Sequence, residues 1–207
     1  EVLSQQPIRN RTEMKKIYLA YFLLAALSAC GNKETNSVRL NGEIKGLGSD
    51  TIYIYGTDKF YNRMDTLIVK DGKFSATLTT DTLVSTWLQF NDGTKYPLYL
   101  NKGDKIQIKG SASDLSSLDI TGNSSNQEFT AFQKDLKGVG KPSDKVLEEK
   151  AEAFINSHHS SLVSIYLLDK YFVQKPQPDF TLIKNMTDRM TGGLKDRPYI
   201  DELLDRI

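Results

Sequence analysis

Short segments of alternating apolar and polar residues, separated by turn residues, fill residues 38–121 and constrain the fold more than any other feature. Asp71-Gly72 and Asp92-Gly93 each join two such segments, and this dipeptide between alternating segments is typical of a β-hairpin. Short strands at regular spacing favour a sandwich or barrel. Residues 38–122 are therefore predicted to form a small antiparallel β-sandwich or barrel-like domain, with strands at residues 38–44, 51–55, 66–69, 74–78, 84–90, 96–100, 105–109 and 118–120.

After Gly122 the apolar residues change to helical spacing. Ser125 and Glu128 have the Ser-x-x-Glu spacing of a helix capping box, and Ser143 is placed to cap a second helix. Further helices are predicted at residues 162–172 and 180–190 and from Pro198 onwards. Residues 123–207 therefore form a helical region, and the fold class is α+β.

Eleven uncharged residues, 17–27, follow the positively charged residues Lys15 and Lys16. As a helix this segment spans roughly 16 Å, well short of the ~30 Å core of a bilayer. Its length and flanks are those of a signal peptide over residues 14–29. Residues 1–13 precede this signal and are interpreted as an upstream extension that is not native.

The signal ends in Leu27-Ser28-Ala29-Cys30, which resembles the bacterial lipobox. The resemblance implies that a signal peptidase recognises Leu27, Ser28 and Ala29, and that Cys30 receives lipid, including fatty acids such as palmitate. Several acyl chains anchor a protein stably, since each buried methylene contributes about 0.8 kcal/mol. Residues 30–37 would then be the lipidated cysteine and a tether. The alternative is an ordinary cleavage site with an incidental cysteine.

Charge and cysteine content exclude several functions. Residues 1–29 hold four basic and two acidic residues, which leaves 23 basic and 24 acidic residues in the remainder. Without a basic excess, nucleic acid is not an expected partner. The chain has one cysteine, so no intramolecular disulfide or dithiol centre is expected. Gly31 follows Cys30, at the position where lipoproteins with an inner-membrane retention signal often carry Asp. The resemblance to those sorting rules implies the outer membrane, on its periplasmic face or at the surface.

No pattern typical of a catalytic, cofactor or metal site is recognised. Adjacent His158 and His159 point to different sides of a helix, and are interpreted as a turn between helices. Gly-x-Ser-x-Gly and phosphate-loop motifs are absent from the sequence. Three acidic residues of the second helix are interpreted as a solvated helix face: Glu148, Glu149 and Glu152. The β region is rich in aromatic residues, which form either its core or an exposed stacking platform for a sugar or a partner protein: Tyr53, Tyr55, Phe60, Tyr61, Trp87, Tyr96 and Tyr99.

Several of these segments resemble a known group of proteins: residues 38–46, 51–55, 65–66, 69–74, 98–103 and 120–126. They are similar to the uncharacterised β domain that precedes a thioredoxin-like domain of the TlpA/ResA type in many Bacteroidetes lipoproteins. Residues 153–157, Ser161 and residues 164–168 resemble the helical linker of the same proteins. In that family the redox chemistry belongs to a Trp-Cys-x-x-Cys motif, which this sequence lacks.

The resemblance implies a membrane-anchored, non-catalytic accessory module of a thioredoxin-like thiol-disulfide oxidoreductase system, with no cofactor. Its partners would be the membrane, through Cys30, and a thioredoxin-like domain or envelope protein. The alternative is a surface or periplasmic lipoprotein that binds glycans or other ligands. The final helix presents an apolar face made of Tyr199/Ile200, Leu203/Leu204 and Ile207. We therefore expect a further domain to cover that face, encoded after Ile207.

Overall fold

The computed structural model describes residues 36–206, which belong to one compact unit. Its strands are β1 (Ser37–Lys45), β2 (Asp50–Gly56), β3 (Met64–Val69), β4 (Lys73–Thr79), β5 (Val84–Gln89), β6 (Lys95–Leu100), β7 (Lys105–Ser111) and β8 (Asp119–Thr121). Its helices are α2 (Ser124–Gly138), α3 (Asp144–Ser157), α4 (Leu162–Leu168) with the π-helical turn η1 (Asp169–Val173), α5 (Phe180–Asp188), the 3-10 turn η2 (Gly192–Leu194) and α6 (Pro198–Leu204). The predicted α+β class is confirmed.

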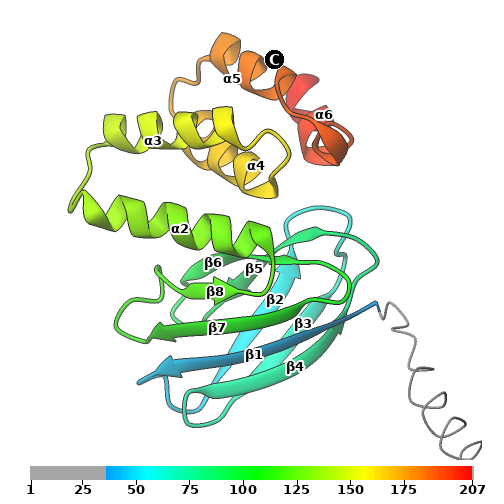
Figure 1. Ribbon diagram of the computed structural model, residues 1–207, viewed down its shortest axis with the longest axis vertical. Coiled ribbons are helices and arrows are strands. Elements are labelled where there is room, and N and C mark those ends of the chain that lie inside the picture. Colours follow the sequence, from blue (N-terminus) through cyan, green and yellow to red (C-terminus); the bar gives the residue numbers. More distant parts are fainter. Residues whose placement is uncertain (1–35, 207) are drawn as a thin grey trace, which may run out of the picture. The chain divides into compact units, whose positions relative to one another are not determined.

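The described strands form two four-stranded sheets (Figure 1). The first sheet has the order β4-β1-β7-β8 and the second has the order β3-β2-β5-β6. The expected sandwich is confirmed, whereas the barrel-like alternative is wrong because the two sheets do not close on each other. One pairing also departs from the antiparallel expectation: β1 and β7 run parallel.

The hairpin between β3 and β4 follows from its turn residues. Asp71 and Gly72 both have positive φ angles, of 50° and 75°, and Lys70 pairs with Lys73 around them. Two consecutive positive φ angles define the type I′ turn that matches the twist of the flanking strands. The Asp-Gly dipeptide thus sets the register that turns Val69 and Phe74 into the core.

Residues Leu40, Gly42 and Ile44 of β1 face the space between the sheets, where the alternating apolar residues of both sheets are buried. Gly42 lies directly opposite Phe74 of β4. A Cβ atom at Gly42 would lie 2.0 Å from Cζ of the Phe74 ring, so only glycine leaves room for this side chain. The Phe74 ring therefore packs over Gly42, in the part of the core next to the Asp71-Gly72 turn.

Helix α2 closes the β-sandwich by bonding to an edge strand of each sheet. The Asn126 side chain accepts from the Tyr99 amide at 3.0 Å and donates to the Tyr99 carbonyl at 2.7 Å, which completes the edge of β6. One turn later, Thr130 Oγ1 lies 3.1 Å from both the amide nitrogen and the carbonyl oxygen of Ile120 in β8. Edge strands expose unpaired backbone groups, and these two side chains satisfy them.

The predicted capping box at Ser125 and Glu128 is wrong, although the helix begins nearby. Asn123 is the N-cap, and its side chain accepts from the Asn126 amide. Gly122 turns the chain early, at a φ of 116°, where a Cβ atom would meet the Lys105 carbonyl oxygen at 2.3 Å. Glu128 bonds to Ser161 instead of reaching back to the helix start.

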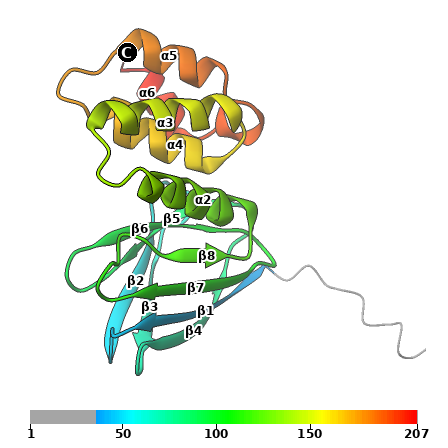
Figure 2. The same ribbon diagram turned by 60° about the vertical axis from the view of Figure 1, so that its left-hand side comes forward.

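The remaining helices pack beyond α2 (Figures 1 and 2). Ser143 caps α3 as predicted, and α4 is apolar on most sides because it packs between other helices. In the last helix, Ile200 and Leu203 are buried within the described residues, whereas Leu204 is 38% exposed. Ile207 lies outside the described range. Within residues 36–206, none of the helices is both long and apolar enough to cross a membrane.

Candidate functional site

The residues predicted for lipid attachment and signal cleavage, Leu27, Ser28, Ala29 and Cys30, lie outside the described residues. The aromatic residues of the β region divide into two groups. Tyr61, Tyr96 and Tyr99 are buried, which agrees with a core role. The other four remain in contact with solvent: Tyr53, Tyr55, Phe60 and Trp87. Of these, Tyr53, Tyr55 and Trp87 share the outer face of the second sheet, whereas Phe60 lies in the loop after β2.

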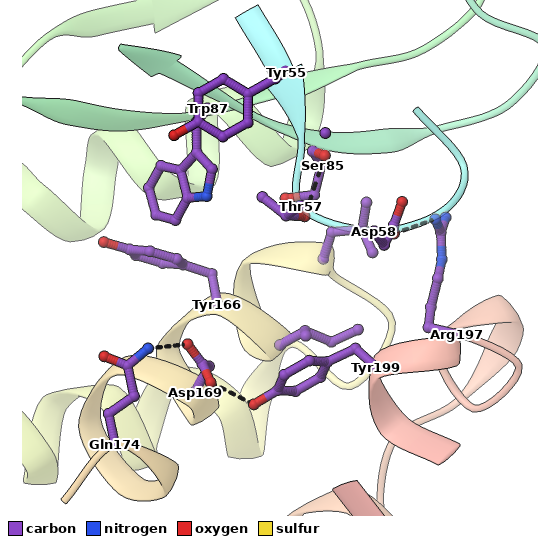
Figure 3. A pocket seen from close by; sticks show the side chains of 13 residues that line it. Tyr55, Thr57, Asp58, Ser85, Trp87, Tyr166, Asp169, Gln174, Arg197 and Tyr199 are labelled. Atoms are coloured by element: carbon purple, nitrogen blue, oxygen red, sulfur yellow. Dashed lines mark hydrogen bonds and ion pairs between the residues drawn. The ribbon is translucent and has the colours of Figure 1, made fainter. Parts of the chain in front are cut away.

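A cavity of about 350 Å³ lies between the outer face of the second sheet and the helical region (Figure 3). Its volume falls within the ~300–1,000 Å³ of small-ligand sites. The β2–β5 side, α4 with η1, and the start of α6 each supply part of the wall. The lining residues are Tyr55, Gly56, Thr57, Asp58, Ser85, Trp87, Leu162, Ile165, Tyr166, Asp169, Gln174, Arg197 and Tyr199.

The aromatic wall of the cavity begins on the second sheet. Tyr55 of β2 and Trp87 of β5 are directly opposite in the antiparallel register, so both side chains point to the outer face. The Tyr55 hydroxyl donates to Gln89 Oε1 at 2.8 Å, which fixes its ring. From α4, Tyr166 meets Trp87 in an edge-on arrangement, with ring centroids 5.7 Å apart. The helical region therefore covers Trp87 without filling the space beside it.

A carboxylate held by two donors lies at the helical side of the cavity (Figure 3). The Tyr199 hydroxyl and the Gln174 side-chain amide each donate to Asp169 at 2.5 Å. Burial raises the pKa of Tyr199, and the hydrogen bond to Asp169 raises it further. The Tyr199 hydroxyl therefore stays protonated and remains a donor at neutral pH. Asp169 also begins the π-helical turn η1, a feature frequent at functional sites.

A buried ion pair joins the two sides of the cavity. Arg197, at the N-cap of α6, lies 3.4 Å from Asp58 in the loop after β2, and their side chains are only 10% and 9% exposed. The guanidinium also donates to the Leu83 carbonyl at 2.7 Å and lies 4.6 Å from the Phe60 ring centroid. The charge of Arg197 is therefore balanced by Asp58, and its N–H groups bond to acceptors within the protein.

The other residues singled out from the sequence lie away from this cavity. His158 caps the end of α3 and His159 follows in the turn before α4, as predicted. Ser157 Oγ is 2.9 Å from His158 Nδ1, but this hydroxyl also donates to the carbonyls of Ala153 and Phe154 one turn earlier. Glu148 and Glu149 form ion pairs with lysines at the helix surface. Within residues 36–206, no three potential ligand side chains gather as a metal site would require.

Sequence reasoning found Tyr55 and Trp87 as candidate ligand-contacting aromatics but missed the polar residues beside them. Asp58 and Arg197 are separated by 139 residues, so no local spacing connects them. The sequence does contain a signal at Asp169, which with Lys170 interrupts the apolar residues 162–172. A charge on a helix predicted to be buried indicates a polar contact inside the fold.

Part of the chain matches a family model. Residues 38–129 match the family model described as "Domain of unknown function (DUF4369)", which covers less than half of the 207-residue chain. No curated protein matches the chain. The match confirms the expected uncharacterised β domain. It extends into α2 as far as Phe129, so it includes Asn126, the residue that joins this helix to β6.

Proposed function

We propose that this chain, whose residues 38–129 match the DUF4369 family, is a non-catalytic binding module anchored in the cell envelope. The observation that supports a binding role is the cavity beside Trp87. It combines aromatic walls with Asp169, a carboxylate whose position is fixed by Tyr199 and Gln174. Apolar walls with a few fixed polar groups are the usual composition of a ligand site.

The cavity lacks the arrangement that acid–base or nucleophilic chemistry requires. Its two carboxylates, Asp58 and Asp169, are already bound to Arg197 and to Tyr199 with Gln174. Its hydroxyl residues Thr57 and Ser85 have no histidine or lysine among the lining residues to activate them. These features support binding as the role of the site. The proposed accessory module would recognise substrates for a thioredoxin-like domain on the same or a partner chain.

A glycan is the second candidate ligand, and the pairing of Trp87 and Tyr55 favours it. Aromatic rings offer an apolar surface on which the C–H face of a sugar ring can pack. The Asp169 carboxylate and the Gln174 amide lie on the other side of the cavity, where they can bond to sugar hydroxyls. The two candidates therefore use the same cavity and differ in the ligand.

Binding can be followed directly, because Trp87 is the only tryptophan of the chain. We expect its fluorescence to change when the correct ligand fills the cavity. Titration with unfolded thiol-blocked polypeptides tests the accessory role, and titration with neutral oligosaccharides tests the glycan alternative. If Trp87 emission responds to neither class, the proposed binding function is contradicted.

Replacing Tyr55 by alanine is expected to weaken ligand binding about tenfold, the loss typical of a central aromatic contact. Tyr53→Ala is the matched control, because Tyr53 lies two residues earlier on the same face of β2 but does not line the cavity. The affinity of each variant is measured by the Trp87 titration. Equal affinities in the two variants would place the ligand elsewhere.

Anchoring has a separate test. Cys30→Ser is expected to abolish labelling by a clickable fatty acid and to leave uncleaved precursor, because a hydroxyl cannot replace the thiolate that receives lipid. Labelling is read by in-gel fluorescence of whole cells. Retention of the fatty acid in the serine variant would show that Cys30 is not the attachment site.

A further inference from the structure

The outer face of the first sheet is exposed and basic. Alternate residues of its strands point away from the core, and five of these are cations: Arg39, Lys45, Lys73, Lys105 and Lys109. We call this surface the basic face. In Figures 1 and 2, α2 lies next to β8 and the other helices lie beyond α2, so that β1 and β4 are left uncovered. The face is therefore open to a partner.

The register of the basic face contains one like-charged pair and a cluster in which a single carboxylate lies between two lysines. Arg39 of β1 is directly beside Lys105 of β7, and Lys73 and Lys109 lie on either side of Glu43. Like charges at neighbouring positions of a sheet lower its stability. The Arg39–Lys105 pair therefore costs the sheet some stability, and an external anion bound beside it would offset this repulsion.

Within the described residues, many cations of the helical region form ion pairs, which the five cations of the basic face do not. Among residues 36–206, the five form no ion pair, whereas helix lysines such as Lys150 and Lys184 are paired with Asp135 and Asp188. The only other carboxylate on this face, Asp119, is bound by Lys134 at 3.0 Å. Glu43 and Asp119, which is opposite Lys109, are the two carboxylates that face the five cations, so the face keeps an excess of positive charge although the chain as a whole is close to neutral.

From this geometry we propose that the basic face docks on the anionic phospholipid headgroups of the membrane that carries the anchor. This inference rests on the proposed lipid at Cys30. Strand β1, in the interior of the first sheet, begins at Ser37, and seven residues of chain span at most about 25 Å. The anchor thus holds this face within reach of the bilayer surface, where each basic residue raises affinity for anionic lipid about fivefold.

Docking in this orientation has a consequence for the cavity. Tyr55, Ser85 and Trp87 line the cavity from the outer face of the second sheet, on the opposite side of the sandwich from the basic face. A membrane against the basic face leaves the cavity open to the aqueous compartment. The anchored module would then present its ligand site outwards.

The test uses the lipid-anchored full chain inserted into two kinds of vesicle, phosphatidylcholine alone and phosphatidylcholine mixed with phosphatidylglycerol. Lysines are labelled with an amine-reactive reagent and quantified by mass spectrometry. On the anionic vesicles, labelling of Lys73, Lys105 and Lys109 is expected to be about fivefold slower than on neutral vesicles, and high salt should abolish the difference. Lys141 and Lys195, exposed in the helical region, should label equally on both.

The double variant Lys105→Glu/Lys109→Glu should remove the protection of Lys73, whereas Lys141→Glu/Lys195→Glu, with the same change in net charge, should keep it. Equal labelling of the basic face on both vesicles, with the chain bound to each, would overturn the docking proposal and leave the anchor intact. A chain that stays off both vesicles would contradict the anchor as well. Protection that appears only with a soluble polyanion such as heparin would also overturn the proposal, in favour of a soluble partner.

Discussion

Replacing Arg197 by methionine is expected to lower the free energy of unfolding by about 3–5 kcal/mol, the range measured when one partner of a buried ion pair is removed. Methionine keeps much of the side-chain volume but leaves the Asp58 carboxylate, 9% exposed, without its cation. The Leu83 carbonyl loses its side-chain donor at the same time. Equilibrium denaturation in urea, followed by circular dichroism, measures the change.

Two further variants test whether the loss comes from the buried charge that is left without a partner. Lys59→Met removes an ion pair to Glu202 between the same two segments, but its side chains are 80% and 51% exposed, so a loss below about 1 kcal/mol is expected. Asp58→Asn in the Arg197→Met background should recover part of the stability, because the asparagine removes the unpaired charge and keeps the acceptor for the Phe60 amide. A loss of similar size in Lys59→Met and Arg197→Met would show that burial of the pair does not matter.

The strands could be predicted because their determinants are local. At Asp71-Gly72 the two positive φ angles belong to the dipeptide itself, and the alternation of Phe74 with polar neighbours gives the buried face. The hairpin at Gly93 follows in the same way, with a φ of 86° at the glycine and a hydrogen bond from the Phe90 amide to the Thr94 carbonyl. Such turns need no information from distant parts of the chain.

The features that the sequence did not predict depend on distant contacts. The parallel pairing of Arg39 with Lys105 joins segments separated by five strands, and alternation is identical in parallel and antiparallel strands when one face is buried. The cavity was missed for the same reason, since Trp87, Asp169 and Arg197 come from separate elements. Their proximity is a result of the packing of helices on the second sheet.

The start of α2 shows how tertiary contacts select among local signals. Ser125 and Glu128 satisfy the capping-box spacing, yet Asn123 caps the helix. An N-cap at Ser125 would place Asn126 at the first helical position and alter its approach to Tyr99, whereas the cap at Asn123 brings the Asn126 side chain onto the backbone of β6. Two buried hydrogen bonds outweigh the small difference between one capping residue and another.

Replacing Asn126 by leucine is the second change with a large expected effect, a loss of about 2–4 kcal/mol in the free energy of unfolding. Leucine has the same branched skeleton of four side-chain heavy atoms as asparagine and is a better helix former, so helix propensity does not explain a loss. The cost comes from the Tyr99 amide, whose side-chain acceptor is Asn126 Oδ1 at a site where Asn126 is only 2% exposed. The Tyr99 carbonyl keeps the Asn123 side chain as a donor at 2.9 Å, which limits the loss.

Gln127→Leu is the matched control for this prediction, since Gln127 is the next residue of α2 and is exposed. It should change the stability by less than about 0.5 kcal/mol. Thr130→Val tests the equivalent bond at the other sheet, because it removes the hydroxyl that lies 3.1 Å from the Ile120 amide, and it should cost about 1–3 kcal/mol. If Asn126→Leu proves as stable as Gln127→Leu in urea denaturation, the edge of β6 does not depend on α2. The helix would then be joined to the β-sandwich through apolar contacts such as Phe129 with Tyr96, whose ring centroids are 5.3 Å apart.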